Sequence, residues 1–201
     1  KIKSNKIAFI KEAIQQVKKH FETADIVHHL AGITAVPRVK SEANAEHEKK
    51  IEEVAIEGTQ NIIDSIKDNC KIILPSTHVV YEGIKNVKEN ISENEDTLPV
   101  LAYGKSKAYN EKQLKESGKN FIILRLGSVY GYSTDTTRLD IMTNLFSKIS
   151  SQDGLLKLYA GGRQIKSLVP LIDVARCFKF MEEKENISSE IFNLTKDTVT
   201  V

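Results

Sequence analysis

Tyr103-Gly-Lys-Ser-Lys107 lies between two apolar runs, Lys71-Ile-Ile-Leu-Pro-Ser-Thr77 and Asn120-Phe-Ile-Ile-Leu124. Each run has the length and composition of a buried strand. Between them, the segment from Tyr103 to Leu114 contains good helix formers, which predicts a helix. A strand, a helix and a second strand in this order indicate a parallel sheet with a right-handed crossover. The stretch therefore predicts an α/β fold.

The same alternation extends toward the N-terminus and predicts a larger parallel sheet. We expect strands at Lys6–Ile10 and at Asp25-Ile-Val-His-His-Leu-Ala-Gly32, and helices at 11–21 and 46–67. Both helical segments carry apolar residues at helical spacing. Helices of this length are expected on both faces of the sheet.

Beyond residue 131 the pattern changes. We expect a helix at 139–149, a turn at 161–164, a helix at 174–183 and a short strand at Ile191–Leu194. Residues 1–131 are predicted to form the main domain. Residues 132–201 are predicted to form mainly a smaller substrate lobe over the carboxyl edge of the sheet, with segments that return to the sheet. Ligands of open α/β sheets bind at that edge.

Composition excludes several classes of protein. The 201 residues have a net charge of +2, which does not favour a nucleic-acid partner. No apolar run reaches the roughly 20 residues of a membrane span. The two cysteines form neither a metal-binding spacing nor a disulfide framework, so we expect no metal and a reducing, cytoplasmic location.

Tyr103 and Lys107 suggest acid–base chemistry. Residues four apart on a helix lie on one face. A Tyr base near neutral pH needs a pKa about three units below its usual value, or roughly 4 kcal/mol. One ammonium about 4 Å away supplies that at an effective dielectric constant of ~20. Tyr81-Glu-Gly-Ile-Lys85 has the same spacing, but Gly83 interrupts it.

Thr77 has two interpretations. Together with Ser76 it could simply cap the end of a strand. With a Tyr–Lys helix next along the chain, its hydroxyl could instead orient a substrate oxygen.

Three other features also have a structural alternative. His28 and His29 fall in an apolar strand, where packed, neutral side chains are expected rather than metal ligands. Ala31-Gly32 could form a tight turn or allow a cofactor to approach the backbone. Arg163 and Lys166 could be solvated or could bind phosphate.

Six segments together resemble the extended short-chain dehydrogenase/reductase superfamily, in particular its NAD(P)-dependent nucleotide-sugar epimerases and dehydratases. They are His29-Leu-Ala-Gly32, Gly58-Thr-Gln-Asn-Ile-Ile63, Ser76-Thr-His-Val-Val-Tyr81, Tyr103-Gly-Lys-Ser-Lys107, Arg125-Leu-Gly-Ser-Val-Tyr-Gly131 and Val169-Pro-Leu-Ile-Asp-Val-Ala175. The resemblance covers nearly the whole chain and implies a Rossmann-type sheet that binds NAD or NADP.

The resemblance also implies roles for individual residues. Tyr103 would be the acid/base, Lys107 would lower its pKa and hold the nicotinamide ribose, and Thr77 would bind the reacting oxygen. The implied cofactor contacts are Leu30, Ala31, Gly32, Ser76, Tyr103, Lys107 and Leu126. The implied substrate contacts are Thr77, Ser128, Arg163 and Lys166, with Ser128 in place of the family's usual Asn and Lys166 in place of an Arg.

Two departures from the family pattern affect these expectations. No Gly-rich turn precedes residue 30, so we expect the first βαβ portion to be missing and the 201 residues alone to be inactive. The residue that would select NAD or NADP is missing with it. Ala55 replaces the usual Asn of the long helix, which puts that support of the catalytic region in question.

The expected function is interconversion of nucleotide-sugar epimers through a keto intermediate. His78 and Val79 stand where the family's dehydratases carry acidic residues, which argues against dehydration. Ser76-Thr-His-Val-Val-Tyr-Glu-Gly83 has the length seen in keto-sugar reductases, which remain an alternative, as does a catalytically idle binding subunit. The family's dimer interface implies a homodimer through helices 46–67 and 104–116. Ile51, Val54 and Ile62 supply apolar surface there, although the same residues could be buried entirely against the sheet.

Overall fold

A parallel sheet of four strands forms the centre of the computed structural model, which describes residues 21–33, 45–86, 88–134 and 138–201. Its strands lie in the order β1 (Ile26–His28), β2 (Lys71–Thr77), β3 (Asn120–Leu126) and β6 (Glu190–Leu194). Along the central pair, Lys71 is the register partner of Asn120 and Thr77 that of Leu126. The α/β prediction is confirmed.

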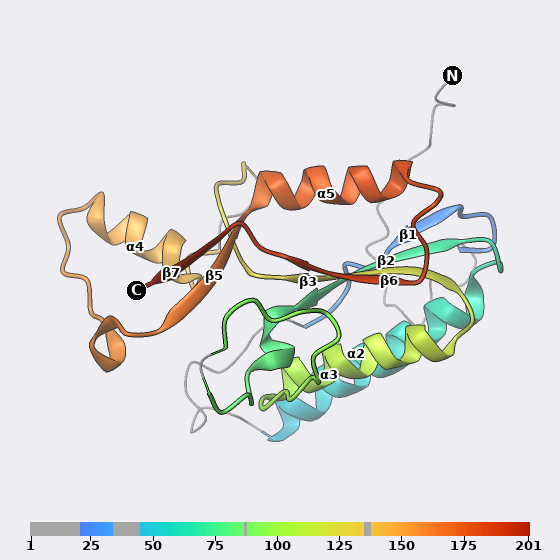
Figure 1. Cartoon of the computed structure of the whole chain (residues 1–201), viewed down its shortest axis with the longest axis horizontal. Coiled ribbons are helices and arrows are strands. Elements are labelled where there is room, and N and C mark those ends of the chain that lie inside the picture. Colours follow the sequence, from blue (N-terminus) through green and yellow to red (C-terminus); the bar gives the residue numbers. More distant parts are fainter. Residues whose placement is uncertain (1–20, 34–44, 87, 135–137) are drawn as a thin grey trace.

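Helices cover both faces of this sheet, as predicted (Figure 1). On one face lie α2 (Ala45–Ser65) and α3 (Ala102–Glu116), and on the other lies α5 (Leu171–Glu183). Lys71 ties the sheet to α5, because its buried ammonium donates hydrogen bonds to the carbonyl oxygens of Met181 (3.2 Å) and Lys184 (2.6 Å) at the end of that helix.

The apolar runs of β2 and β3 divide their side chains between the two faces. Ile72, Leu74 and Ile123 pack with residues of α2 and α3, including Ile62 and Leu114. Successive side chains of a strand point to opposite faces. The intervening strand residues therefore point to the other face. There Ile73, Ile122 and Leu124 form a second core cluster with Cys177, Phe178 and Met181 of α5. Burial on both faces explains why these strands are continuously hydrophobic.

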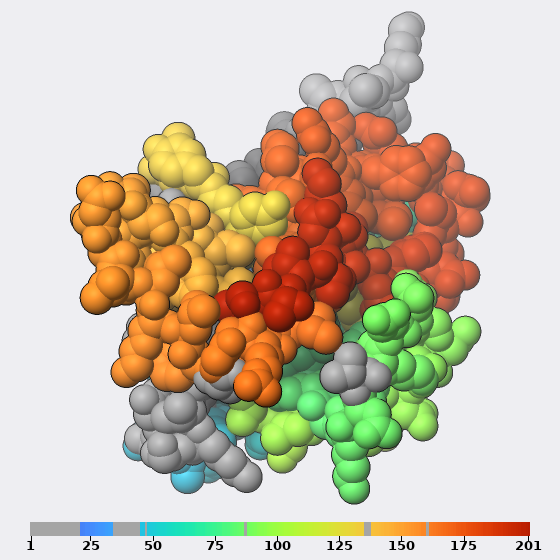
Figure 2. All heavy atoms as spheres, turned by 60° about the vertical axis from the view of Figure 1, so that its left-hand side comes forward, coloured from blue at the N-terminus to red at the C-terminus, as the bar shows by residue number. Residues whose placement is uncertain are grey.

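A smaller mixed sheet begins where the main strands end. It contains β4 (Ser128–Tyr130), β5 (Ile165–Pro170) and β7 (Asp197–Thr200), with β5 at its centre. β4 follows β3 after one residue and β7 follows β6 after two, so this sheet stands at the carboxyl edge of the main sheet. In Figure 2, β7 (red) lies between the segment that carries α4 (Met142–Ser150) and η3 (Tyr159–Gly162), both orange, and residues 88–99 (green).

Several elements differ from their predicted bounds. The strand predicted at 25–32 is limited to the three residues of β1, and the helix predicted at 139–149 begins at Met142. Strands β5 and β7 were not predicted, because each depends on a partner that is distant in sequence. The predicted strand Lys6–Ile10 and, apart from Phe21, the helix 11–21 lie outside the described residues.

The described ranges lack two kinds of feature that would indicate other binding classes. None of the helices there combines the length and hydropathy needed to cross a bilayer. Within the same ranges, no group of three or more His, Cys, Asp or Glu side chains is placed to hold a metal ion.

Candidate active site

The carboxyl ends of the parallel strands bring the predicted site segments to one edge. Thr77 ends β2 beside its register partner Leu126, which ends β3. Residues 30–32 follow β1 after His29, and Ser128 begins β4. This is the edge at which ligands of open α/β sheets bind.

Tyr103 lies in the first turn of α3, and Lys107 lies one turn later. Tyr103 is half-buried, whereas the side chain of Lys107 is buried and its Nζ donates a hydrogen bond to the carbonyl oxygen of Pro75 (3.0 Å). Pro75 is two residues before Thr77 in β2. The contact therefore holds the Tyr–Lys face of the helix against the end of the strand that carries Thr77.

Burial dominates the electrostatics at Tyr103. It raises the pKa of Tyr103, and the positive charge of Arg138 acts against this rise. The ammonium of Lys107 donates its hydrogen bond to Pro75. Burial lowers the pKa of Lys107 to about 8, although the Glu111 carboxylate acts in the opposite direction.

The hydroxyl of Thr77 has a structural partner. Its Oγ1 accepts a hydrogen bond from the backbone N–H of Val79 (3.3 Å) and caps the short helix η2 (His78–Tyr81). The capping interpretation of Thr77 therefore describes this structure. The Thr77 hydroxyl can still donate a hydrogen bond to a substrate oxygen.

Glu111 is a residue of this site that the sequence analysis missed. Ser76 is buried, and its hydroxyl donates a hydrogen bond to Oε1 of Glu111 across 2.5 Å. Glu111 is also paired with Arg125 of β3, and both side chains are almost completely buried. Two features of the sequence could have indicated this pair. Arg125 is a charged residue within an otherwise apolar strand, and Glu111 is an acidic residue one helical turn after Lys107.

The segment after β1 divides into a buried and an exposed part. His29 is 3% exposed, its Nε2 lies 2.8 Å from Oγ1 of Thr59, and burial lowers its pKa to about 3, with the charge of Lys107 acting in the same direction. The expectation of a packed, neutral His29 is confirmed. Leu30 is 64% exposed, and a Cβ added to Gly32 would meet no atom within 4 Å.

The predicted substrate residues lie in or beside the second sheet. Ser128 in β4 pairs with Leu168 of β5, the strand that also carries Lys166. Lys166 is half-buried, and its charge adds to the burial that lowers the pKa of His78. Arg163 precedes β5 and has an exposed side chain.

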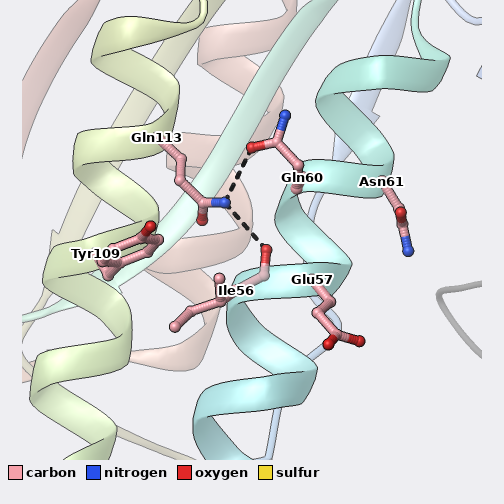
Figure 3. A pocket seen from close by; sticks show the side chains of 6 residues that line it. All are labelled: Ile56, Glu57, Gln60, Asn61, Tyr109 and Gln113. Carbon is pink, nitrogen blue, oxygen red and sulfur yellow. Dashed lines mark hydrogen bonds between the residues drawn. The ribbon is translucent and has the colours of Figure 1, made fainter.

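A hollow of about 380 Å³ lies away from these residues, between α2 and α3. It is lined by Ile56, Glu57, Gln60, Asn61, Tyr109 and Gln113 (Figure 3). The side-chain amide of Gln113 reaches across it to the carbonyl oxygen of Ile56 (3.0 Å) and to Oε1 of Gln60 (3.2 Å). None of the predicted site residues lines the hollow, so it is not the candidate active site.

The sequence profile of the NAD dependent epimerase/dehydratase family matches residues 9–195. The chain belongs to this family. No curated protein sequence matches it.

Solved structures with the same fold include three nucleotide-sugar epimerases. UDP-glucuronic acid 4-epimerase from Bacillus cereus, solved with NAD, is 25% identical with a TM-score of 0.78, and the alignment covers 96% of this chain and 61% of that one. UDP-glucose 4-epimerase from Thermotoga maritima is 22% identical (TM-score 0.77; 96% and 64% covered). UDP-N-acetylglucosamine 4-epimerase from Methanobrevibacter ruminantium is also 22% identical (TM-score 0.78; 95% and 62% covered). The chain thus spans about three fifths of the length of these proteins.

Proposed function

We propose that this protein is an NAD(P)-dependent nucleotide-sugar epimerase. The observation that carries the proposal is the hydrogen bond from Lys107 to Pro75, which holds the Tyr103–Lys107 face of α3 beside Thr77. Family membership supports the same class of reaction.

The residues at the sheet edge fit a nicotinamide dinucleotide. Lys107 uses one of the three N–H donors of its ammonium on Pro75, which leaves two for ribose hydroxyls. Beyond β1, the open space at Gly32 leaves the backbone accessible. When bound, the dinucleotide would accept a hydride from the sugar carbon and return it.

The chain's own residues would manage the proton and the orientation of the sugar. Tyr103 would take the proton of a sugar hydroxyl as the keto group forms and return it when the keto group is reduced. Thr77 would donate a hydrogen bond to the same oxygen. Lys107 would stabilise the deprotonated Tyr103 through its positive charge.

The second sheet would bind the nucleotide part of the substrate. Ser128 and Lys166 lie on its neighbouring strands, and Lys166 would place a positive charge near the diphosphate. Arg163 would contribute only if the substrate reached its exposed position. Residues 1–131 would thus hold the cofactor, and residues 132–201 would mainly hold the sugar nucleotide.

We also propose a homodimer through the outer face of α2 and α3. Ile51 and Ile62, expected to form this interface, are only 2% exposed and are buried within the protomer. The interface would instead use half-buried Ile56, Tyr109 at 45% exposure and the polar lining of the hollow. The cytoplasm remains the proposed location.

A keto-sugar reductase is the second candidate, because the segment from Ser76 to Gly83 has the length seen in those enzymes. Gly83 also has a packing role here: a Cβ at this position would lie 2.3 Å from the carbonyl oxygen of Leu98. Since this close approach alone requires a glycine, Gly83 is weak support for reduction.

The two reactions differ in their use of cofactor. The full-length protein should be incubated with NAD and, separately, UDP-glucose, UDP-glucuronic acid and UDP-N-acetylglucosamine, and the sugars separated by chromatography. We expect two epimers and no steady change in reduced-nicotinamide absorbance. Stoichiometric consumption of NADPH with a keto-sugar would establish the reductase instead. Tight binding of the nucleotide sugar without turnover would indicate a non-catalytic subunit.

A further inference from the structure

Glu111 and Arg125 form a buried ion pair between helix α3 and strand β3. Their side chains are 3% and 2% exposed. Arg125 donates from Nε to both carboxylate oxygens (3.0 and 3.2 Å) and from Nη2 to Oε2 (2.7 Å). Contacts of this forked geometry fix orientation as well as distance.

The same carboxylate reaches a second strand. Oε1 of Glu111 accepts a hydrogen bond from the hydroxyl of Ser76 across 2.5 Å, and Ser76 directly precedes Thr77. On α3, Glu111 lies four residues after Lys107 and eight after Tyr103, so all three occupy one side of the helix. One carboxylate thus joins the Tyr–Lys helix to the strand end that carries Thr77.

The guanidinium extends this connection to β6, the strand next to β3. Arg125 donates from Nη1 to Oη of Tyr81 (2.5 Å) and to the carbonyl oxygen of Glu93 (3.1 Å). Tyr81 in turn donates to Oδ1 of Asn193 in β6 (3.0 Å). The network therefore spans three strands of the main sheet and the loop after η2.

We propose that Glu111 is a positioning residue of the candidate active site, which locks Tyr103 and Lys107 on α3 at a fixed distance from Thr77 on β2. This inference rests on the proposed function, because it assigns Glu111 a role through these three residues. A buried ion pair often adds little net stability, since desolvation offsets the attraction. Glu111 also bonds to Ser76, which directly precedes the proposed catalytic residue Thr77. An ion pair that served only to stabilise the fold would not need this additional contact.

Glu111 also acts on the charge of Lys107. Its carboxylate opposes the effect of burial on the pKa of Lys107. Lys107 also interacts with the carbonyl of Pro75 in β2 and with His29 after β1, while the charge of Arg138 acts on Tyr103. Removal of the carboxylate should therefore lower the pKa of Lys107 from about 8 to a still lower value.

Ser76→Ala in the full-length protein tests the positional link while leaving the ion pair in place. We expect kcat to fall about 10- to 100-fold, as for a small misplacement of catalytic groups. The affinity for NAD, measured by calorimetry, should stay near that of the wild type, and the melting temperature should fall by no more than the loss of one buried hydrogen bond explains. An unchanged kcat would overturn the proposal, as would weaker NAD binding with a normal kcat, because Ser76 would then be a cofactor contact.

Glu111→Gln tests the charge, with Glu116→Gln as a matched control. Glu116 lies on the same helix in an exposed pair with Lys112. The titration of Lys107, followed by NMR of isotope-labelled lysine and assigned with Lys107→Arg, should move to lower pH in Glu111→Gln only. An unmoved titration would overturn the proposal. If Glu111→Gln does not fold, the Ser76→Ala result decides.

These measurements separate the positioning role from the proposed function. A wild-type protein without epimerase turnover would reject the function, and the Lys107 titration would still decide whether Glu111 controls this site.

Discussion

The side-chain amide of Asn110 donates a hydrogen bond to the backbone carbonyl oxygen of Ala55 across 2.9 Å, joining α3 to α2. Asn110 is 2% exposed and lies three residues after Lys107. The family resemblance implies an Asn at the position of Ala55 on the long helix. In the structure the contact uses the backbone carbonyl of Ala55 and the side-chain amide of Asn110.

Asn110→Ala should destabilise the protein by about 1–2 kcal/mol, because a buried hydrogen bond to a backbone carbonyl is lost. Urea denaturation of the full-length protein measures the change. Asn69→Ala is the control, since Asn69 is exposed and lies in the turn between α2 and β2. Equal effects of the two variants would contradict the prediction.

Tyr103→Phe should lower kcat by about 10²- to 10⁴-fold, the usual contribution of a general acid/base. NAD affinity should barely change, because only the hydroxyl is removed. Tyr109→Phe, which alters an exposed hydroxyl on the same helix, should be nearly neutral. Substantial turnover in Tyr103→Phe would show that another group transfers the proton.

The burial of Lys107 predicts a pH-dependent stability. Its pKa is about 8 when folded and about 10.4 when unfolded. Between these values the unfolded chain binds more protons, so this group makes the folded state more stable as pH rises from 8 to 10.4. The contribution is on the order of 3 kcal/mol.

The measurement is the free energy of unfolding of the wild type minus that of Lys107→Met at pH 7.5 and pH 9.5. The difference is needed because burial raises the pKa of Cys70 to about 11, which has the opposite effect at high pH. The wild type should gain stability relative to Lys107→Met at the higher pH. A difference that is independent of pH would contradict the prediction.

The homodimer should depend on the outer face of α2 and α3. In sedimentation at tens of micromolar, the full-length protein should be a dimer and Tyr109→Asp a monomer, because the introduced charge would be buried without a partner. Phe180→Asp is the control: Phe180 is similarly exposed but lies on α5, on the opposite face of the sheet (Figure 1). A monomeric wild type would reject the interface.

The sequence by itself determined the central sheet and the Tyr–Lys face. The apolar runs at Lys71–Thr77 and at Asn120–Leu126 required burial on both sides, which a parallel sheet covered by helices provides. The spacing of Tyr103 and Lys107 was local, because a helix fixes which residues share a face.

Only the tertiary structure decided which partners the buried polar groups take. Ser76 bonds to Glu111, Lys107 to Pro75 and Arg125 to Glu111, across elements that no local pattern places together. Strands β5 and β7 likewise depend on pairing between distant segments. Periodicity indicates which side of an element is buried, but hydrogen bonds and ion pairs depend on the final distances between elements, which packing of the whole chain sets.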